Sequence, residues 1–314
     1  MGIKSLRGKE IKETLERSSI PIGKIYFYDF SVESEWSLLT DFKGEPYVVK
    51  YPTEDMFKDA NIILVASPEG IDQKFLLKAM EEGTFIIDLS NSFNEDENVP
   101  LIVDGINHEL IKGVSIIANP HPISIILSLV FHQLRKKFEI DNISSVAFQP
   151  VSEFQEEGVE EFINQTVAIL NATHIPRKVL KEQRAFDLIP ESEKNERKIV
   201  RELERILGIK SSSITIIKAP VFHCFAVMTF LTISGDPKIE ELEAEFRKNP
   251  KFKILARNQT PTPASVAGRD GIFIKISKNA DFPSRYSIWT VSDNFRTGFA
   301  KNAISIIQRI VLMQ

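Results

Sequence analysis

The sequence predicts an α/β fold in which a doubly wound parallel sheet is followed by a second, α+β domain. Three short and almost wholly apolar runs, at 61–66, 84–89 and 114–118, alternate with helical patterns in the first third of the 314 residues. Parallel strands that are covered on both faces have this composition. Beyond residue 120, helical segments precede runs of strands that suit antiparallel pairing, as is typical of an α+β domain.

Each element follows from its local pattern. Amphipathic spacing predicts most of the helices, and Gly83 and Gly208 each follow the last turn of one. The run 123–131 is apolar on all sides and predicts a helix buried over most of its surface. The predicted helices span residues 11–18, 71–82, 123–138, 156–171, 193–207 and 298–311. The predicted strands span 24–29, 61–66, 84–89, 114–118, 144–148, 214–218, 225–234, 271–277 and 286–291. We expect a first domain of residues 1–119 with 299–314, and a second of residues 120–298.

The composition is that of an ordinary globular protein, with 43% hydrophobic and 26% charged residues and a net charge of −4. Basic and acidic residues are mixed along the chain, so we expect neither nucleic acid nor a membrane as partner. The single cysteine, Cys224, excludes an intramolecular disulfide and fits a reducing cytoplasm. The amino terminus lacks a signal-peptide core, and the longest apolar run is too short to span a bilayer. His108, His132 and His174 lack metal-ligand spacing, so no metal site is expected.

Short motifs recur along almost the whole chain in a fixed order. They lie at 88–93, 96–103, 116–124, 148–152, 183–190, 219–222, 260–270 and 289–303. In this order they resemble the motifs of the aspartate-β-semialdehyde dehydrogenase family, and the resemblance implies a Rossmann-like first domain. In that family a cysteine thiolate attacks the aldehyde, a histidine acts as base, and a nicotinamide takes the hydride before phosphate displaces the acyl group.

The catalytic positions of this family are altered. The segment 116–124 resembles Asn-Pro-x-Cys-x-Ser/Thr, but Pro122 stands in the cysteine position and carries no group that can attack a carbonyl. The family's base falls on Phe225, which cannot exchange a proton near neutral pH. A phosphate- or substrate-binding arginine of the family falls on Asn94. The resemblance therefore implies a homologue without the family's chemistry.

The cofactor positions are altered as well. The family opens with an apolar strand and a glycine-rich turn; Gly2 and Gly8 match its first and last glycines, while Ser5 falls on the middle one. The preceding strand has no counterpart, so either the chain starts late or the cofactor site has decayed. Ser67 and Asn294 fall at other cofactor positions, and the loop 66–70 carries Glu69, whose carboxylate disfavours a phosphate. We expect no cofactor, although the related enzymes use NADP.

Several other positions match the family. The resemblance implies that Gln149 orients substrate, that Asn119 precedes the nucleophile, and that Lys198 binds phosphate on a helix that also carries Glu202. Gln149 and Asn119 can equally be explained as satisfying buried backbone groups, and we favour this explanation. We also considered His121 with His223 as a new acid–base pair and Cys224 as a displaced nucleophile. A lone cysteine in an apolar strand is more often an inert core residue.

These features predict a catalytically inactive homologue that acts as a dimeric structural or interaction protein, with an unidentified protein partner. Two alternatives remain open: NADP-dependent semialdehyde dehydrogenase activity in amino-acid biosynthesis, and a small-molecule sensor that uses the remaining cleft. The expected dimer rests on one apolar strand region with large side chains on both faces, so that both need cover. Its residues are Phe222, Phe225, Val227, Phe230 and Leu231.

Overall fold

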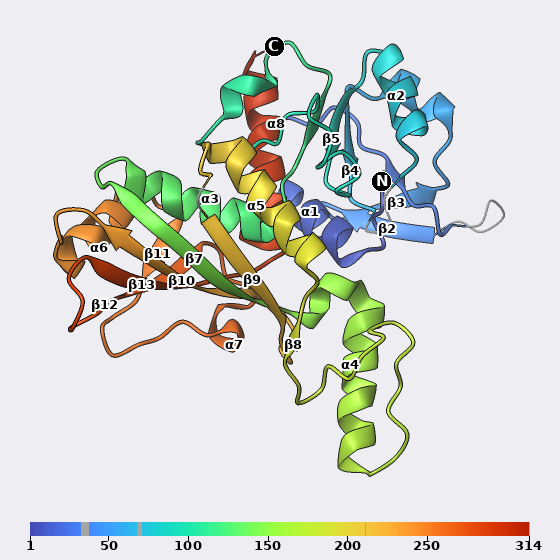
Figure 1. Ribbon diagram of the computed structural model, residues 1–314. Coiled ribbons are helices and arrows are strands. Elements are labelled where there is room, and N and C mark those ends of the chain that lie inside the picture. Colours follow the sequence, from blue (N-terminus) through green and yellow to red (C-terminus); the bar gives the residue numbers. More distant parts are fainter. Residues whose placement is uncertain (33–37, 68–70, 211, 314) are drawn as a thin grey trace. The chain divides into compact units, whose positions relative to one another are not determined.

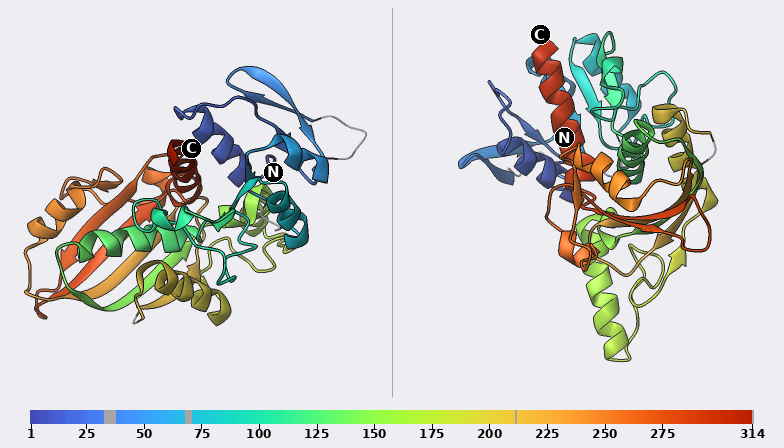
Figure 2. Two further views of the ribbon diagram at one scale, coloured as in Figure 1. Left: turned by 90° about the horizontal axis from the view of Figure 1, so that it is seen from above. Right: turned by 90° about the vertical axis from the view of Figure 1, so that its left-hand side faces the viewer.

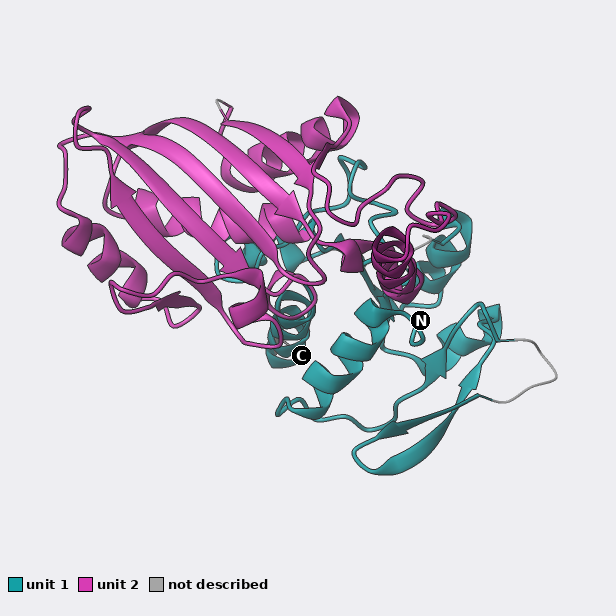
Figure 3. Ribbon diagram, turned by 90° about the horizontal axis from the view of Figure 1, so that it is seen from below, with its two compact units in different colours: residues 1–121, 299–314 teal, residues 122–298 magenta. Residues whose placement is uncertain are grey.

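The computed structural model describes residues 1–32, 38–67, 71–210 and 212–313. The chain forms two compact units, drawn in teal and magenta in Figure 3. Unit 1 comprises residues 1–121 and 299–314, and unit 2 comprises residues 122–298. Part of the expected cofactor loop, Pro68 to Gly70, lies outside the described residues. No helix in the described ranges has the length and apolar character needed to cross a membrane.

Unit 1 contains two three-stranded sheets (Figure 1). The parallel sheet has the order β4-β5-β6, with β4 at Ile62–Val65, β5 at Phe85–Asp88 and β6 at Ile116–Ala118. These strands confirm the three apolar runs read from the sequence. The second sheet has the order β1-β3-β2, with β1 at Phe27–Tyr28, β2 at Leu38–Phe42 and β3 at Glu45–Lys50. β1 is parallel to β3, and β2 with β3 forms a hairpin that the sequence pattern did not predict.

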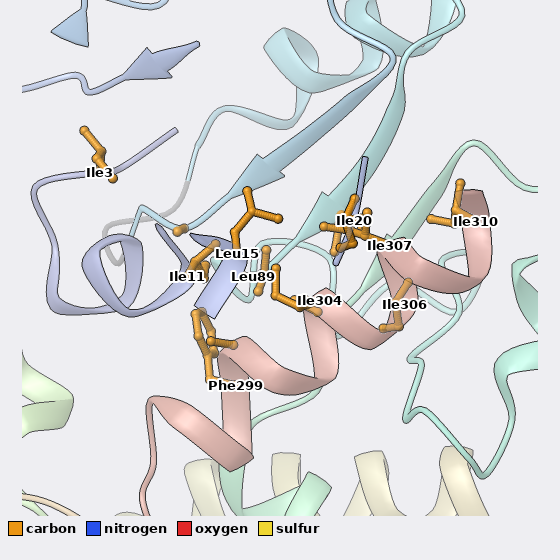
Figure 4. Close-up of a cluster of buried hydrophobic side chains, with 14 of the residues drawn as sticks. Ile3, Ile11, Leu15, Ile20, Leu89, Phe299, Ile304, Ile306, Ile307 and Ile310 are labelled. Atoms are coloured by element: carbon orange, nitrogen blue, oxygen red, sulfur yellow. The ribbon is translucent and has the colours of Figure 1, made fainter. Parts of the chain in front are cut away.

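Helices pack against the sheets of unit 1. The helical segments are α1 at Leu6–Glu16, η1 at Glu54–Asp59, α2 at Gln73–Glu81, η2 at His108–Ile111 and α8 at Lys301–Met313. Helices α1 and α8 pack on each other, and their apolar side chains form one cluster with β5 and β6. Figure 4 shows Ile11 and Leu15 of α1 near Phe299 and Ile304. The carboxy-terminal helix therefore belongs to the core of unit 1.

Unit 2 is built on one mixed sheet with the strand order β11-β12-β13-β10-β7-β9-β8. Its strands are β7 at Ile140–Gln149, β8 at Ile189–Pro190, β9 at Ser212–Lys218, β10 at Phe225–Ile233, β11 at Phe252–Ile254, β12 at Ile272–Lys278 and β13 at Arg285–Ser292. Its helical segments are α3 at Pro122–Arg135, η3 at Val151–Phe154, α4 at Gln155–Leu170, α5 at Glu193–Leu207, α6 at Ile239–Arg247 and α7 at Pro263–Val266, and η4 at Arg296–Ala300 leads into α8. The mixed sheet with its helices confirms the α+β class of this region.

The two faces of this sheet are covered differently. Helices α3, α5 and α6 lie on one face (Figure 2). The other face, which we call the open face, is seen in Figure 3; α7 covers one end of it, where Val266 packs with Ala226 and Phe273. Side chains of β10 alternate accordingly: Val227 and Leu231 are buried, and Phe230 on the opposite face is 50% exposed. The register aligns Val146, Met228 and Trp289 across three neighbouring strands on the same face as Phe230. An apolar row therefore runs across the open face.

Candidate functional site

A tight glycine-containing turn joins the amino terminus to α1 in unit 1. Gly2 has φ +83, and a Cβ added to it would lie 2.5 Å from the backbone nitrogen of Ser67. A Cβ added to Gly8, in the first turn of α1, would lie 2.1 Å from the carbonyl oxygen of Gly2. Only glycine fits at either position without a backbone shift. Such close approach of helix, turn and strand is a feature of dinucleotide-binding turns.

Ser5 and Met1 fix this turn at the carboxyl end of β4. Ser5 caps α1: its Oγ accepts a hydrogen bond from the Gly8 N–H (2.9 Å) and donates one to the Gly2 carbonyl (2.7 Å). The Met1 carbonyl accepts from the N–H of Ala66 (2.9 Å). The amino end of α1, where helices favour anions, therefore lies at the sheet edge where open α/β sheets bind ligands.

The loop after β5 reaches the same edge and is organised by a buried carboxylate. Asp88 accepts hydrogen bonds from the N–H and the Oγ of Ser90 and from the N–H of Phe93. Burial raises the pKa of Asp88, although these bonds act in the opposite direction. Asn94, which we expected at the position of the family's arginine, donates to the Asn91 Oδ1 (3.2 Å) and to the carbonyl of Asn119 (3.5 Å). The loops after β5 and β6 are thus joined by an uncharged amide.

Asn119 follows β6 and its amide takes part in packing. Its Oδ1 accepts a hydrogen bond from the Asn302 Nδ2 of α8 (2.8 Å), and its backbone N–H donates to the Asp88 carbonyl (2.7 Å). Asn302 also donates to the Ile102 carbonyl and accepts from the N–H of Asp104. The side chain of Asn119 therefore ties the end of β6 to α8.

In unit 2, the residue that the family motif led us to expect at the nucleophile position begins a helix. Pro122 is buried and is the first residue of α3. Proline suits this position because its fixed φ is helical and the missing N–H would have no partner within the helix. A Cβ added to Gly298 would lie 3.0 Å from the Pro122 Cβ, so the proline ring fills the space beside Gly298. Pro122 is a helix-starting, packed residue here.

Phe225, which we expected at the position of the family's base, is fully buried at the first position of β10. The register Ala226↔Phe148 places it beside Gln149, the last residue of β7. The Oε1 of Gln149 is buried and has no hydrogen-bond partner within the described residues. The structure thus brings Phe225 and Gln149 together, and it leaves one buried acceptor free at the end of β7.

Asn294 is fully buried and holds three segments of unit 2 together. Its Oδ1 accepts from the N–H of Cys224 (3.1 Å), and its Nδ2 donates to the Ser152 Oγ (3.2 Å) and the Glu153 Oε1 (2.7 Å). Cys224 has φ +76, a conformation that favours glycine, and it is fully buried. Burial raises the pKa of the Cys224 thiol. This thiol is therefore protonated and out of reach of solvent.

Lys198 and Glu202 lie four residues apart on α5 and share one face of that helix. Glu202 is buried and Lys198 is half-buried. In the same helix the Glu196 Oε1 accepts the N–H of Ile216 on β9. These residues lie on the helix that packs on β9. No group of three side chains that could hold a metal ion occurs in the described part of the chain.

Arg184 is a candidate that the sequence did not reveal. Its guanidinium is fully buried, donates from Nη2 to the carbonyls of Gln149 (3.3 Å) and Ala219 (3.4 Å), and lies 5.4 Å from the centre of the Phe154 ring. Burial lowers the pKa of Arg184 to about 10. Polar residues precede it and Ala185 and Phe186 follow it, and this local sequence does not signal a buried charge beside Gln149.

Two family descriptions match the chain. Residues 1–114 match the NAD binding domain of semialdehyde dehydrogenases, and residues 132–297 match their dimerisation domain. Aspartate-semialdehyde dehydrogenase of Aquifex aeolicus is 28% identical over 97% of this chain and 94% of its own length, and that of Bacillus subtilis is 26% identical over 96% and 94%.

Solved structures share the fold. Aspartate semialdehyde dehydrogenase II of Vibrio cholerae, solved as a complex with ASA, has a TM-score of 0.91 at 24% identity and covers 99% of this chain and 96% of its own. The Candida albicans enzyme, solved with NADP, has a TM-score of 0.70 at 15% identity, with 98% and 96% covered.

These matches correct the expectation that no cofactor is involved. Residues 1–114 match an NAD binding domain, and a structure with the same fold was solved with NADP. The expectation relied on Ser5 and on the absent preceding strand. The fold nevertheless keeps the close glycine contacts of the turn, because Gly2 and Gly8 pack against Ser67 and against each other. With Ser5 at the middle position of the glycine motif, the turn still has the close backbone contacts that Gly2 and Gly8 allow.

Replacement of Gly8 by alanine should destabilise unit 1. The added methyl group would meet the Gly2 carbonyl, so we expect Gly8→Ala to lower the free energy of unfolding by about 1–3 kcal/mol. Gly23→Ala is the matched control because nothing lies within 4 Å of its Cβ position, and its effect should stay within about 0.5 kcal/mol. Urea unfolding of both variants measures the difference. Equal stability of the two variants would contradict the tight turn.

The Cys224 thiol should resist modification in the folded protein. Because it is buried and its pKa is raised, labelling by a thiol-reactive disulfide at pH 8 should be at least about 100-fold slower than in the urea-unfolded chain. Absorbance of the released thiolate measures the rate. Rapid labelling of the native protein would show that Cys224 is an accessible nucleophile.

Proposed function

The chain belongs to the semialdehyde dehydrogenase family, and we propose that it binds a nicotinamide dinucleotide without oxidising aldehydes through a covalent thiol intermediate. The observation that carries the proposal is Pro122, which the family motif places at the nucleophile and which starts α3 as a buried residue. Covalent aldehyde oxidation needs a thiolate at that point, and proline has no atom that can replace it.

The only thiol of the chain does not replace the missing nucleophile. Cys224 is fully buried, its backbone N–H is bound to Asn294, and burial raises its pKa. A nucleophilic cysteine needs the opposite, an accessible thiol with a lowered pKa. A hydrophobic side chain, Phe225, also fills the position where the family has its base. Both steps that begin the family reaction therefore lack a group in this chain.

Dinucleotide binding is supported by the turn at the start of α1. The family implies NAD or NADP, and the residues present fit such a group: Gly2 and Gly8 allow the close backbone contacts that are typical of dinucleotide-binding turns, and the amino end of α1 lies at the ligand edge of the sheet. Gly2, Ser5 and Ser67 would hold its phosphates. A bound dinucleotide supplies a nicotinamide that can accept a hydride.

The match to a dimerisation domain supports a homodimer through the open face of the unit 2 sheet. This face carries Met228, Phe230 and Trp289 on adjacent strands, and Phe230 is half exposed. Exposed apolar patches of this kind are uncommon on monomers, and a two-fold dimer covers the same patch on both copies. We place the structural or partner-binding role of the protein in this dimer, which does not depend on the altered catalytic positions.

The purified protein should bind NADP but should not reduce it with aspartate semialdehyde and phosphate. Calorimetry should give a dissociation constant at or below about 100 μM, and a steady-state assay at 340 nm should show no turnover that exceeds that of the Cys224→Ala variant. Binding together with Cys224-dependent turnover would contradict the absence of covalent chemistry and would favour the activity named for its relatives. Absence of binding would contradict the proposed dinucleotide site.

A charge on the open sheet face should dissociate the dimer. We expect Phe230→Asp to weaken self-association by about 30-fold or more, because it buries a carboxylate in an apolar interface. Leu77→Asp on α2 of unit 1 is the matched control: Leu77 is 46% exposed and Phe230 is 50% exposed. Sedimentation equilibrium at micromolar concentrations measures both. A monomeric parent protein, or equal effects of the two variants, would contradict this interface.

A further inference from the structure

A carboxylate lies beside the glycine-containing turn of unit 1. Asp29 directly follows β1, and its N–H donates to the Lys50 carbonyl at the end of β3 (3.0 Å). Two hydrogen bonds join this point to the turn: the N–H of Gly2 donates to the Tyr28 carbonyl (2.8 Å), and the N–H of Lys4 donates to the Asp29 Oδ2 (2.9 Å). Asp29 is therefore held both by the sheet and by the turn.

The carboxylate of Asp29 is charged and can accept a further hydrogen bond. Its Oδ1 accepts from the N–H (3.0 Å) and the Oγ (2.6 Å) of Ser31. Burial acts to raise the pKa of Asp29, but hydrogen bonds from Ser31 and Lys4 outweigh it and lower the pKa, so the group is ionised at neutral pH. A carboxylate oxygen can accept two hydrogen bonds. The Oδ2, which accepts one from the described residues, can therefore accept another from a ligand hydroxyl.

The position of Asp29 is the one at which a dinucleotide-binding fold meets the adenosine ribose. It follows the strand after α1, about 20 residues beyond the glycine turn, where an acidic side chain binds the ribose 2′-hydroxyl of NAD. NADP carries a phosphate in place of this hydroxyl, and sites for NADP place an arginine nearby. Asp29 thus lies where the two dinucleotides differ.

The charge beside the turn disfavours an added phosphate. Asp29 is only 7% exposed, so solvent screens little the field that it exerts on a charge placed next to it. The cation Lys4 acts on Asp29, and these two side chains together carry no net charge. A ribose hydroxyl would donate to the carboxylate, whereas a 2′-phosphate would be repelled by it.

We propose that Asp29 makes this chain prefer NAD to NADP, because its carboxylate accepts the 2′-hydroxyl of the adenosine ribose and repels a phosphate at the same place. The inference rests on the dinucleotide site proposed above and adds which dinucleotide that site prefers. NADP is the dinucleotide with which the Candida albicans enzyme was solved, so the preference of this chain is the opposite one.

Calorimetric titration of the protein with NAD and with NADP tests the preference. We expect NAD to bind at least about tenfold more tightly than NADP, because the 2′-phosphate would meet a like charge. Asp29→Asn should reverse this order. An amide can donate to the 2′-phosphate, so NADP binding should strengthen about tenfold, while NAD binding should weaken with the loss of the charged acceptor.

Asp55→Asn is the matched control. It removes the same charge from η1, which leads into the amino end of β4, opposite to the end that carries the turn, and Asp55 is an exposed residue paired with Lys58. The ratio of the two affinities should keep its parent value in this variant. Both dinucleotides are titrated into one preparation of each variant, so a loss of folded protein changes the stoichiometry of both titrations and leaves the ratio unchanged.

Three results would contradict the inference. Binding of NADP as tight as that of NAD in the parent protein would refute the preference and leave the dinucleotide site in place. An equal change of the affinity ratio in Asp29→Asn and Asp55→Asn would refute the role of Asp29. No binding of either dinucleotide would overturn the dinucleotide site and the preference together, so the two failures are distinguishable.

Discussion

The close contact between the start of α1 and the end of β4 is the constraint on which unit 1 depends. Gly2 and Gly8 allow the helix, the turn and the backbone of Ser67 to approach within distances that exclude any side chain. This contact sets the direction of α1, which in turn packs on α8 and so brings the carboxy-terminal helix onto the parallel sheet. It also leaves the amino end of α1 at the edge reached by the loops after β4, β5 and β6. The same contact therefore fixes how α1 packs and places the amino end of α1 at the edge where we expect a ligand.

Elements with an unambiguous local pattern could be predicted from the sequence. The runs at 61–66, 84–89 and 114–118 are β4, β5 and β6, because strands covered on both faces need apolar residues at every position. The predicted helix 193–207 has the observed bounds of α5, since Gly208 takes the left-handed conformation that ends it. The hairpin of β2 and β3 was missed because it is largely exposed and lacks a regular apolar alternation. The short, acidic α6 was missed as well.

The candidate site shows a different limit of prediction from the sequence. Motifs gave the positions of Pro122, Phe225 and Asn294, but contacts between segments far apart in the sequence decide what such residues do. Asn294 is bound to Cys224, Ser152 and Glu153, none of which is near it in the chain. Arg184 lacked any local signal, because its burial is produced by β7 and the residues after β9. The cofactor expectation failed for a related reason: it counted glycines in a motif, whereas the fold depends on which backbone atoms approach one another.

The proline that begins α3 also affects the stability of the fold. Proline restricts the backbone of the unfolded chain, and at the first position of a helix it does so without loss of a native hydrogen bond. Replacement of Pro122 by cysteine would introduce a sulfur atom but would also give the unfolded chain more freedom, at a cost of about 0.4–1 kcal/mol. The ring also fills the space beside Gly298, which a cysteine side chain would fill differently. Stability alone therefore favours proline over cysteine at this position.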